Sequence, residues 1–88
     1  MDEGMLLHRV QPVYPRLALV AGVQGTVVLR AIIGRDGAIR QLQATSGPPL
    51  LIPAALDAVS QWRYRPYYLG GQPVEVETQV VVNFVLNK

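Results

Sequence analysis

The chain has 88 residues, of which 50% are hydrophobic and 16% are charged, and its formal net charge is +2. This length allows one small domain and excludes multidomain enzymes and long repeat arrays, while the apolar content argues against disorder. The chain has no cysteine, which excludes disulfides and thiolate metal sites. The weak positive charge is far from the strongly basic footprint of a nucleic-acid-binding domain.

The N-terminal stretch has no pattern that predicts a helix or a strand. We therefore expect residues 1–12 to be a leader or linker remnant and residues 13–88 to form the domain. No run approaches the roughly 20 apolar residues that a membrane helix requires. The first residues, Met1–Gly4, include two acids where a signal peptide would carry bases, so no signal peptide is expected.

A short helix and two strands are predicted next. Proline suits the first helical position and glycine the left-handed position after the last, which predicts a helix over Pro15–Ala21. Period-2 alternation then predicts a strand from Gly25, and Asp36-Gly37 is the signal of a tight antiparallel hairpin. A second strand is expected over Ala38–Thr45. Its alternation slips after Ile39, which predicts a bulge near Arg40-Gln41.

A second helix is expected after the break at Ser46-Gly47-Pro48-Pro49. Pro53 can occupy its first turn, and the helix should end near Gln61 or Trp62. An apolar stripe should face a sheet at helical spacing. Its residues are Ala55, Ala58, Val59 and Trp62. Gly70-Gly71 marks a further turn.

The last segment, Val74–Leu86, alternates cleanly and is predicted to be one strand about twice the usual length of five or six residues. One face should carry Val76, Thr78, Val80, Val82, Phe84 and Leu86. The other should carry Glu75, Glu77, Gln79, Val81, Asn83 and Val85. The order α-β-β-α-β predicts an α+β fold, a two-layer sandwich in which two helices cover one face of a small antiparallel three-stranded sheet.

Residues that could support catalysis are scarce. His8, the single histidine, lies in the leader, and Glu75 and Glu77 share a face that is expected to be solvent-exposed. Ser46 lacks the pattern of a nucleophile elbow and has no histidine to activate it. We therefore expect no enzyme, no catalytic residue, no metal and no cofactor.

Arginines and tyrosines interleave after the second helix, as in sites where bases stack on rings. These residues are Arg63, Tyr64, Arg65, Tyr67 and Tyr68. The net charge of only +2 favours a structural role, so no nucleic-acid partner is expected.

The final strand lacks the prolines and lysines that usually protect a sheet edge. If it lies at the edge, its unpaired N–H and C=O groups can bind an extended peptide by strand addition. The partner-binding residues would then be Val76, Glu77, Thr78, Gln79, Val80, Val81, Val82, Asn83 and Phe84. The alternatives are a central position in the sheet, or pairing with a second copy in a homodimer.

From about Val13 to its end, the chain resembles the C-terminal domain of the TonB energy-transducer family. The likeness rests on a series of short motifs in order, including Trp62-Arg63-Tyr64 and Gly71-Gln72-Pro73-Val74. The residues expected to serve the architecture are Tyr14, Pro15, Gly25, Asp36, Gly37, Ser46, Gly47, Trp62, Tyr64 and Pro66. One departure is Leu51-Ile52-Pro53, where many relatives carry an acidic residue.

The resemblance implies a periplasmic domain of a protein anchored in the inner membrane by an N-terminal helix that lies outside this chain. It implies that the last strand captures the TonB box of TonB-dependent outer-membrane transporters. Inner-membrane motor proteins would supply proton-motive energy through the missing N-terminal region, for uptake of nutrients such as siderophore-bound iron. The alternative is a TonB-like interaction module that self-associates or serves a sensor protein and is not dedicated to transport.

Overall fold

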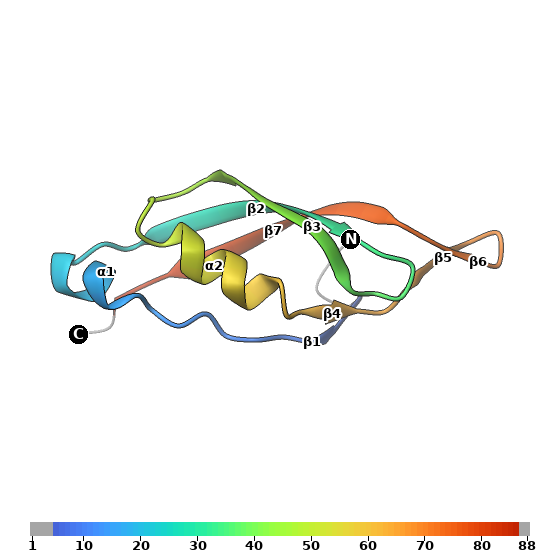
Figure 1. Ribbon diagram of the computed structural model, residues 1–88, viewed down its shortest axis with the longest axis horizontal. Coiled ribbons are helices and arrows are strands. Elements are labelled where there is room, and N and C mark those ends of the chain that lie inside the picture. Colours follow the sequence, from blue (N-terminus) through green and yellow to red (C-terminus); the bar gives the residue numbers. More distant parts are fainter. Residues whose placement is uncertain (1–4, 87–88) are drawn as a thin grey trace.

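The computed structural model describes residues 5–86, which form an elongated molecule of 49 × 21 × 16 Å (Figure 1). The elements in chain order are β1 (Leu6–His8), α1 (Arg16–Ala21), β2 (Gly25–Ile33), β3 (Ile39–Ser46), α2 (Ile52–Val59), β4 (Arg63–Tyr64), β5 (Tyr67–Leu69), β6 (Gln72–Val74) and β7 (Val76–Phe84).

The main sheet has three antiparallel strands in the order β3-β2-β7. β2 pairs with β7 from Gly25 opposite Phe84 to Ile33 opposite Val76 with no register shift. The same alternation that was visible in the sequence gives both strands one buried face and one exposed face. The predicted fold class is confirmed, and β7 lies at the edge of the sheet rather than in its centre.

The core lies between the inner face of this sheet and α2. The buried residues of α2 and its exit are the predicted stripe of Ala55, Ala58, Val59 and Trp62. They face the buried row of β2, whose members are Val27, Leu29, Ala31 and Ile33. α1 closes the end of the sheet where β2 begins and β7 ends (Figure 1). α1 starts one residue later than predicted, with Pro15 as its N-cap, and Gly22 ends it in the left-handed conformation as expected.

The predicted bulge in β3 is confirmed. Ile33 pairs with Ile39 whereas Ile32 pairs with Gln41, so Arg40 is the extra residue. This shift lets Ile39 and Leu42 both pack against the core. The turn before β3 is also tight, and only Gly37 in it takes a positive φ, of 85°.

Asp36 stabilises this turn through its carboxylate. One oxygen accepts the Ala38 N–H at 3.1 Å and the other lies 2.8 Å from Arg40. The Ala38 N–H, followed by the Arg40 charge, lowers the pKa of Asp36 below its usual value of 3.8. A lowered pKa means that the folded state favours the ionised carboxylate.

We expect this ionised carboxylate to make stability depend on pH. The stabilisation is complete above the pKa of the unfolded chain and is lost as pH falls through the lower pKa of the folded state. Urea denaturation of wild type and Asp36→Asn between about pH 5 and pH 2 should show the steeper loss in wild type. Parallel curves for the two proteins would contradict this role for Asp36.

Three parts of the structure differ from the sequence-based expectation. The long strand predicted over Val74–Leu86 is wrong at both ends, because Val74 belongs to β6 and β7 ends at Phe84. β5 and β6 form a hairpin around Gly70-Gly71 that projects from one end of the molecule (Figure 1). α2 ends at Val59, earlier than predicted, and a turn continues to Trp62.

The third difference is in the leader, where β1 pairs with β4. No pattern in residues 1–12 predicted a strand. The Arg65 N–H donates to the Met5 carbonyl at 2.8 Å, and the Trp62 Nε1–H donates to the Val10 carbonyl at 2.9 Å. The Arg9 guanidinium lies 5.3 Å from the centre of the Trp62 ring, which adds a cation–π contact.

Candidate functional site: the open edge of β7

Within residues 5–86, one side of β7 takes no part in strand pairing. It pairs with β2 on one side, and no strand of the described chain pairs with it on the other. It contains no proline or lysine, the residues that commonly block an edge. Its nine residues are those predicted to bind a partner, and the structure places all of them on this strand.

Two hydrogen bonds show which backbone groups of β7 face the open side. The Thr45 hydroxyl donates to the Val28 carbonyl, which therefore points toward β3. Backbone groups of successive strand residues point to alternate sides of the strand. The N–H and C=O of Leu29 therefore point toward β7, and those of its partner Val80 point toward β2. The Leu86 N–H donates to the Gln24 side chain, which precedes β2. This agrees with even-numbered residues of the last segment pointing their backbone groups toward β2.

The unpaired backbone groups consequently belong to the odd-numbered residues of β7. These residues are Glu77, Gln79, Val81 and Asn83. Their side chains lie on the outer, exposed face of the sheet. The edge thus combines a row of free N–H and C=O groups with a row of accessible side chains.

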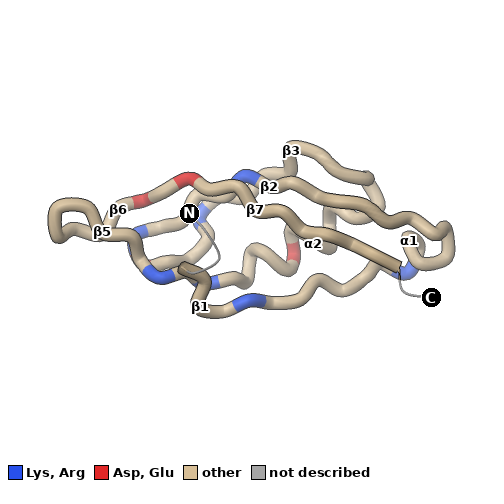
Figure 2. The backbone as a smooth tube through the Cα atoms, turned by 180° about the vertical axis from the view of Figure 1, so that it is seen from behind, with Lys and Arg blue, Asp and Glu red and all other residues tan. Residues whose placement is uncertain are grey.

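The inner side of β7 is buried although the strand lies at an edge. Its inward residues Thr78, Val80, Val82 and Phe84 are each 8% exposed or less. The Tyr14 ring packs edge-on against Phe84 with ring centres 5.4 Å apart. Figures 1 and 2 show the segment from β1 to α1 running beside α2 on the same side of the sheet. Through Tyr14, this segment packs against the inner face of β7.

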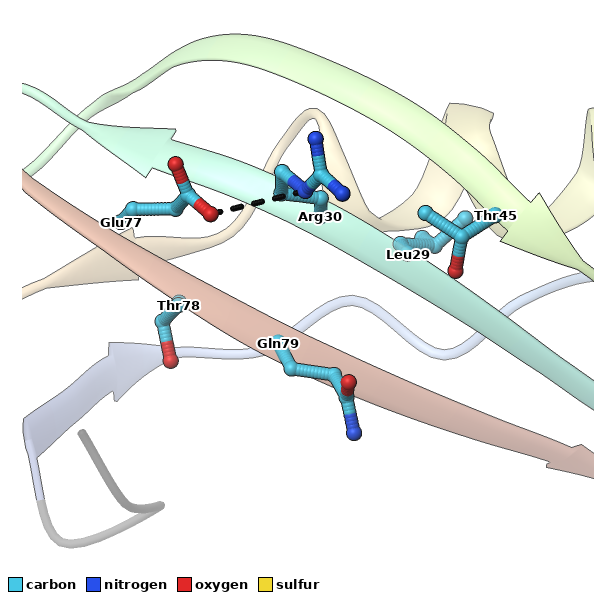
Figure 3. Close-up of a pocket in the computed structure, with 6 residues that line it drawn as sticks. All are labelled: Leu29, Arg30, Thr45, Glu77, Thr78 and Gln79. Atoms are coloured by element: carbon cyan, nitrogen blue, oxygen red, sulfur yellow. Dashed lines mark ion pairs between the residues drawn. The ribbon is translucent and has the colours of Figure 1, made fainter.

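The outer face of the sheet is polar around the middle of β7. The Arg30 Nε lies 3.5 Å from a Glu77 carboxylate oxygen across the β2–β7 pair. A hollow of about 370 Å³ lies here, lined by residues that include Arg30, Glu77 and Thr78. Figure 3 shows the ion pair between Arg30 and Glu77, with the Thr78 side chain pointing away from it. Further along, the Thr26 hydroxyl donates to the Asn83 side-chain oxygen at 2.8 Å. Neither helix of the described chain covers these residues, as is common for one face of an antiparallel sheet.

The residues expected to serve the architecture are spread over the fold. Tyr14 contacts β7 as described, and its hydroxyl donates to the Val23 carbonyl. Gly47 follows Ser46 at the end of β3, where a Cβ would lie 3.0 Å from Val27. At the start of β2, a Cβ on Gly25 would approach Pro48 to 3.0 Å. These two glycines allow the loop before α2 to pack closely on β2.

The aromatic motif after α2 is divided between core and surface. Tyr64 is 6% exposed, and Pro66 is half-buried after it. Tyr67, Tyr68 and Leu69 are exposed on the β5–β6 hairpin, where the sequence predicted only a turn. Because Tyr64 is buried, the motif does not form the continuous stacking surface that nucleic-acid binding would need.

Other types of site lack the required groups in the described residues. Residues 5–86 hold no group of three or more His, Cys, Asp or Glu that could bind a metal ion. None of the helices in this part of the chain is long and apolar enough to cross a bilayer.

Fold and edge together define a small α+β domain in which no described strand pairs with the outer side of β7. Residues 10–86 match the family described as Gram-negative bacterial TonB protein C-terminal. The chain belongs to this family. Membership also means that the chain is not an enzyme.

Relatives and solved structures agree with the family match. The chain is 36% identical to Protein TonB of Vibrio cholerae, over 98% of the chain and 36% of that protein. It is also 36% identical to Protein tonB2 of Pseudomonas aeruginosa, over 92% of the chain and 31% of that protein. The chain therefore spans about a third of the length of these relatives.

Two solved structures are similar across most of the chain. The solution NMR structure of the Pseudomonas aeruginosa TonB CTD aligns with a TM-score of 0.79 and 29% identity, covering 94% of this chain and 86% of that one. The structure of the tonb2 protein from Vibrio anguillarum aligns with a TM-score of 0.70 and 32% identity, covering 96% and 82%.

Proposed function

We propose that this chain is the periplasmic partner-binding domain of a TonB-type energy transducer. In this proposal, the open edge of β7 captures the TonB box of an outer-membrane transporter by strand addition. The parent protein would be anchored in the inner membrane and would receive proton-motive energy from motor proteins through regions outside this chain. The energy would drive uptake of a scarce nutrient such as siderophore-bound iron.

The observation that carries this proposal is the row of unpaired backbone groups on β7. Each interstrand hydrogen bond contributes about 0.5–1.5 kcal/mol net, so a row of them binds a segment firmly without making release slow. Because the bonds lie side by side, a pull along the strand loads them together. A backbone-mediated contact also tolerates variation in the partner's side chains, which suits a domain that serves several transporters.

Val81→Pro is expected to abolish binding of TonB-box peptides while leaving the fold intact. Proline removes the Val81 N–H, which faces the open side and takes no part in pairing with β2. The measurement is calorimetric titration of the purified domain with TonB-box peptides of several transporters. Circular dichroism should show that the variant remains folded.

The matched control is Val81→Thr, which keeps both the N–H and the β-branched shape and should bind like wild type. Gln79→Pro tests the same row and should also lose binding. Unchanged affinity in both proline variants would contradict strand addition at β7. Concentration-dependent sedimentation of wild type to a tight dimer, lost in Val81→Pro, would instead show that a second copy occupies the edge.

A further inference from the structure

The β5–β6 hairpin carries exposed apolar side chains on a projecting tip. Tyr67, Tyr68 and Leu69 are 44%, 60% and 66% exposed. Both glycines of the turn, Gly70-Gly71, have a positive φ, and a Cβ on either of them would have no neighbour within 4 Å. Figures 1 and 2 show the hairpin extending beyond the main sheet, at the end of the molecule opposite α1. The described part of the chain therefore leaves the tip uncovered.

The apolar surface of the hairpin lies on both of its faces. The two strands pair regularly, with Tyr67 opposite Val74 and Leu69 opposite Gln72. Because successive side chains of a strand point to opposite faces, Tyr67 and Leu69 lie on one face and Tyr68 lies on the other. A flat protein surface could cover only one of these faces. A lipid bilayer can cover both, because lipid molecules rearrange around an inserted segment.

The side chains at the tip suit the boundary between water and lipid. Tyrosine combines an apolar ring with a polar hydroxyl and is enriched where membrane proteins meet the lipid headgroups. The three residues of β5 span about 10 Å, which matches the depth of about 5–10 Å to which interfacial segments bury their apolar side chains. Residues 66–74 include no charged side chain, so insertion of the tip would remove no charge from water.

Three arginines lie near the base of the hairpin. Arg63 and Arg65 immediately precede it in the chain. The turn between β2 and β3, which carries Arg35, is joined to β4 by the hydrogen bond from the Tyr64 N–H to the Gly37 carbonyl. Within residues 5–86, none of the three arginines forms an ion pair. Their charges are therefore available to an anionic partner.

The acids near the base do not cancel these three charges. Asp36 is paired with Arg40 at 2.8 Å, and Glu77 is paired with Arg30 at 3.5 Å. Glu75 is left as the one acid here that has no ion pair in the described residues. Three arginines and one glutamate give the base a net charge of +2. Anionic lipid headgroups attract arginines that lie this close to a membrane surface.

We propose that the β5–β6 hairpin inserts its tip into the headgroup region of an anionic phospholipid bilayer, with the arginines at its base against the lipid phosphates. This surface is separate from the open edge of β7, and its binding does not require strand addition there. Three apolar side chains bury too little area for a permanent anchor, so the contact is reversible.

The test is co-sedimentation of the purified domain with phospholipid vesicles at low ionic strength. Wild type should bind vesicles that contain phosphatidylglycerol at least about fivefold more tightly than vesicles of phosphatidylcholine alone. Added salt should weaken the binding to the anionic vesicles, because it screens the attraction between arginine and headgroup. Val81→Pro should bind vesicles like wild type, since the β7 edge takes no part.

Leu69→Ser tests insertion of the tip and should weaken binding to the anionic vesicles about three- to tenfold, because less apolar surface is buried. Circular dichroism should be unchanged, since this side chain is outside the core. The matched control is Leu17→Ser, which removes a leucine of similar exposure, 70%, from α1 at the opposite end of the molecule. This control should bind like wild type.

Arg65→Gln tests the charge at the base and should weaken binding to the anionic vesicles about fivefold while leaving binding to phosphatidylcholine unchanged. Arg16→Gln removes the same charge from α1 and should have a clearly smaller effect. This comparison separates a local contact at the hairpin from an effect of the net charge of the domain.

Three results would overturn the proposal. The first is a wild-type domain that does not sediment with anionic vesicles. The second is equal binding of Leu69→Ser and Leu17→Ser. The third is a dimer of wild type, observed by analytical ultracentrifugation without vesicles, that Leu69→Ser abolishes, because a second copy would then be the partner that covers the tip.

Discussion

Trp62→Ala is expected to lower the free energy of unfolding by about 3–5 kcal/mol, a large part of the stability of a domain of this size. The indole is 3% exposed and packs at the exit of α2, so its removal leaves a cavity in the core. Its Nε1–H also donates a hydrogen bond to the Val10 carbonyl, which connects the leader to the rest of the domain. Urea denaturation should therefore show a much lower midpoint in the variant.

Trp62→Phe separates packing from the hydrogen bond. Phenylalanine keeps an aromatic ring in the core but cannot donate to Val10, so a smaller loss of about 1–3 kcal/mol is expected. Limited proteolysis should then cut near Val10 in a variant that is still folded. If Trp62→Phe resists protease as wild type does, the hydrogen bond to Val10 is not what holds the leader.

Gly37→Ala is expected to destabilise the domain by about 2–5 kcal/mol. A Cβ at this position would lie 1.9 Å from the Tyr64 carbonyl oxygen, and the residue has a φ of +85°. The backbone would have to move, which would disturb the hydrogen bond from the Tyr64 N–H to the Gly37 carbonyl. Thermal and urea denaturation both measure this loss.

Gly22→Ala is the matched control for the backbone conformation. Gly22 also has a left-handed φ, of 68°, but a Cβ there would have no neighbour within 4 Å. Its loss should be about 1–2 kcal/mol, the cost of the left-handed conformation alone. If both variants lose the same free energy of unfolding, the close approach of Gly37 to β4 does not contribute to the cost of Gly37→Ala.

The sequence predicted those elements in which apolar and polar residues alternate over many positions. β2 and β7 alternate over nine residues, and the slip after Ile39 was enough to predict the bulge in β3. β1 and β4 have only three and two residues, too few to show a period. Their pairing depends on contacts between residues more than 50 positions apart, which no local pattern contains.

The candidate site was predicted in part for the same reason. Alternation along Val76–Phe84 showed which side chains share a face, but not whether the strand lies at an edge. Edge position and the direction of each N–H depend on the neighbouring strand. Only the contacts of Thr45 and Leu86 with their neighbours across the sheet reveal that Val81 points its backbone outward.

The pairing of β1 with β4 affects how the domain responds to a pull at its N-terminal side. Tension applied ahead of Met5 would enter at a ladder of two residue pairs and reach the nine-pair β2–β7 ladder only afterwards. The short ladder yields first, because fewer hydrogen bonds share the load. Residues 5–9 would then peel away as far as the Val10–Trp62 hydrogen bond while β7 keeps its shape. Residues 5–9 would thus lengthen under tension before the open edge of β7 is deformed.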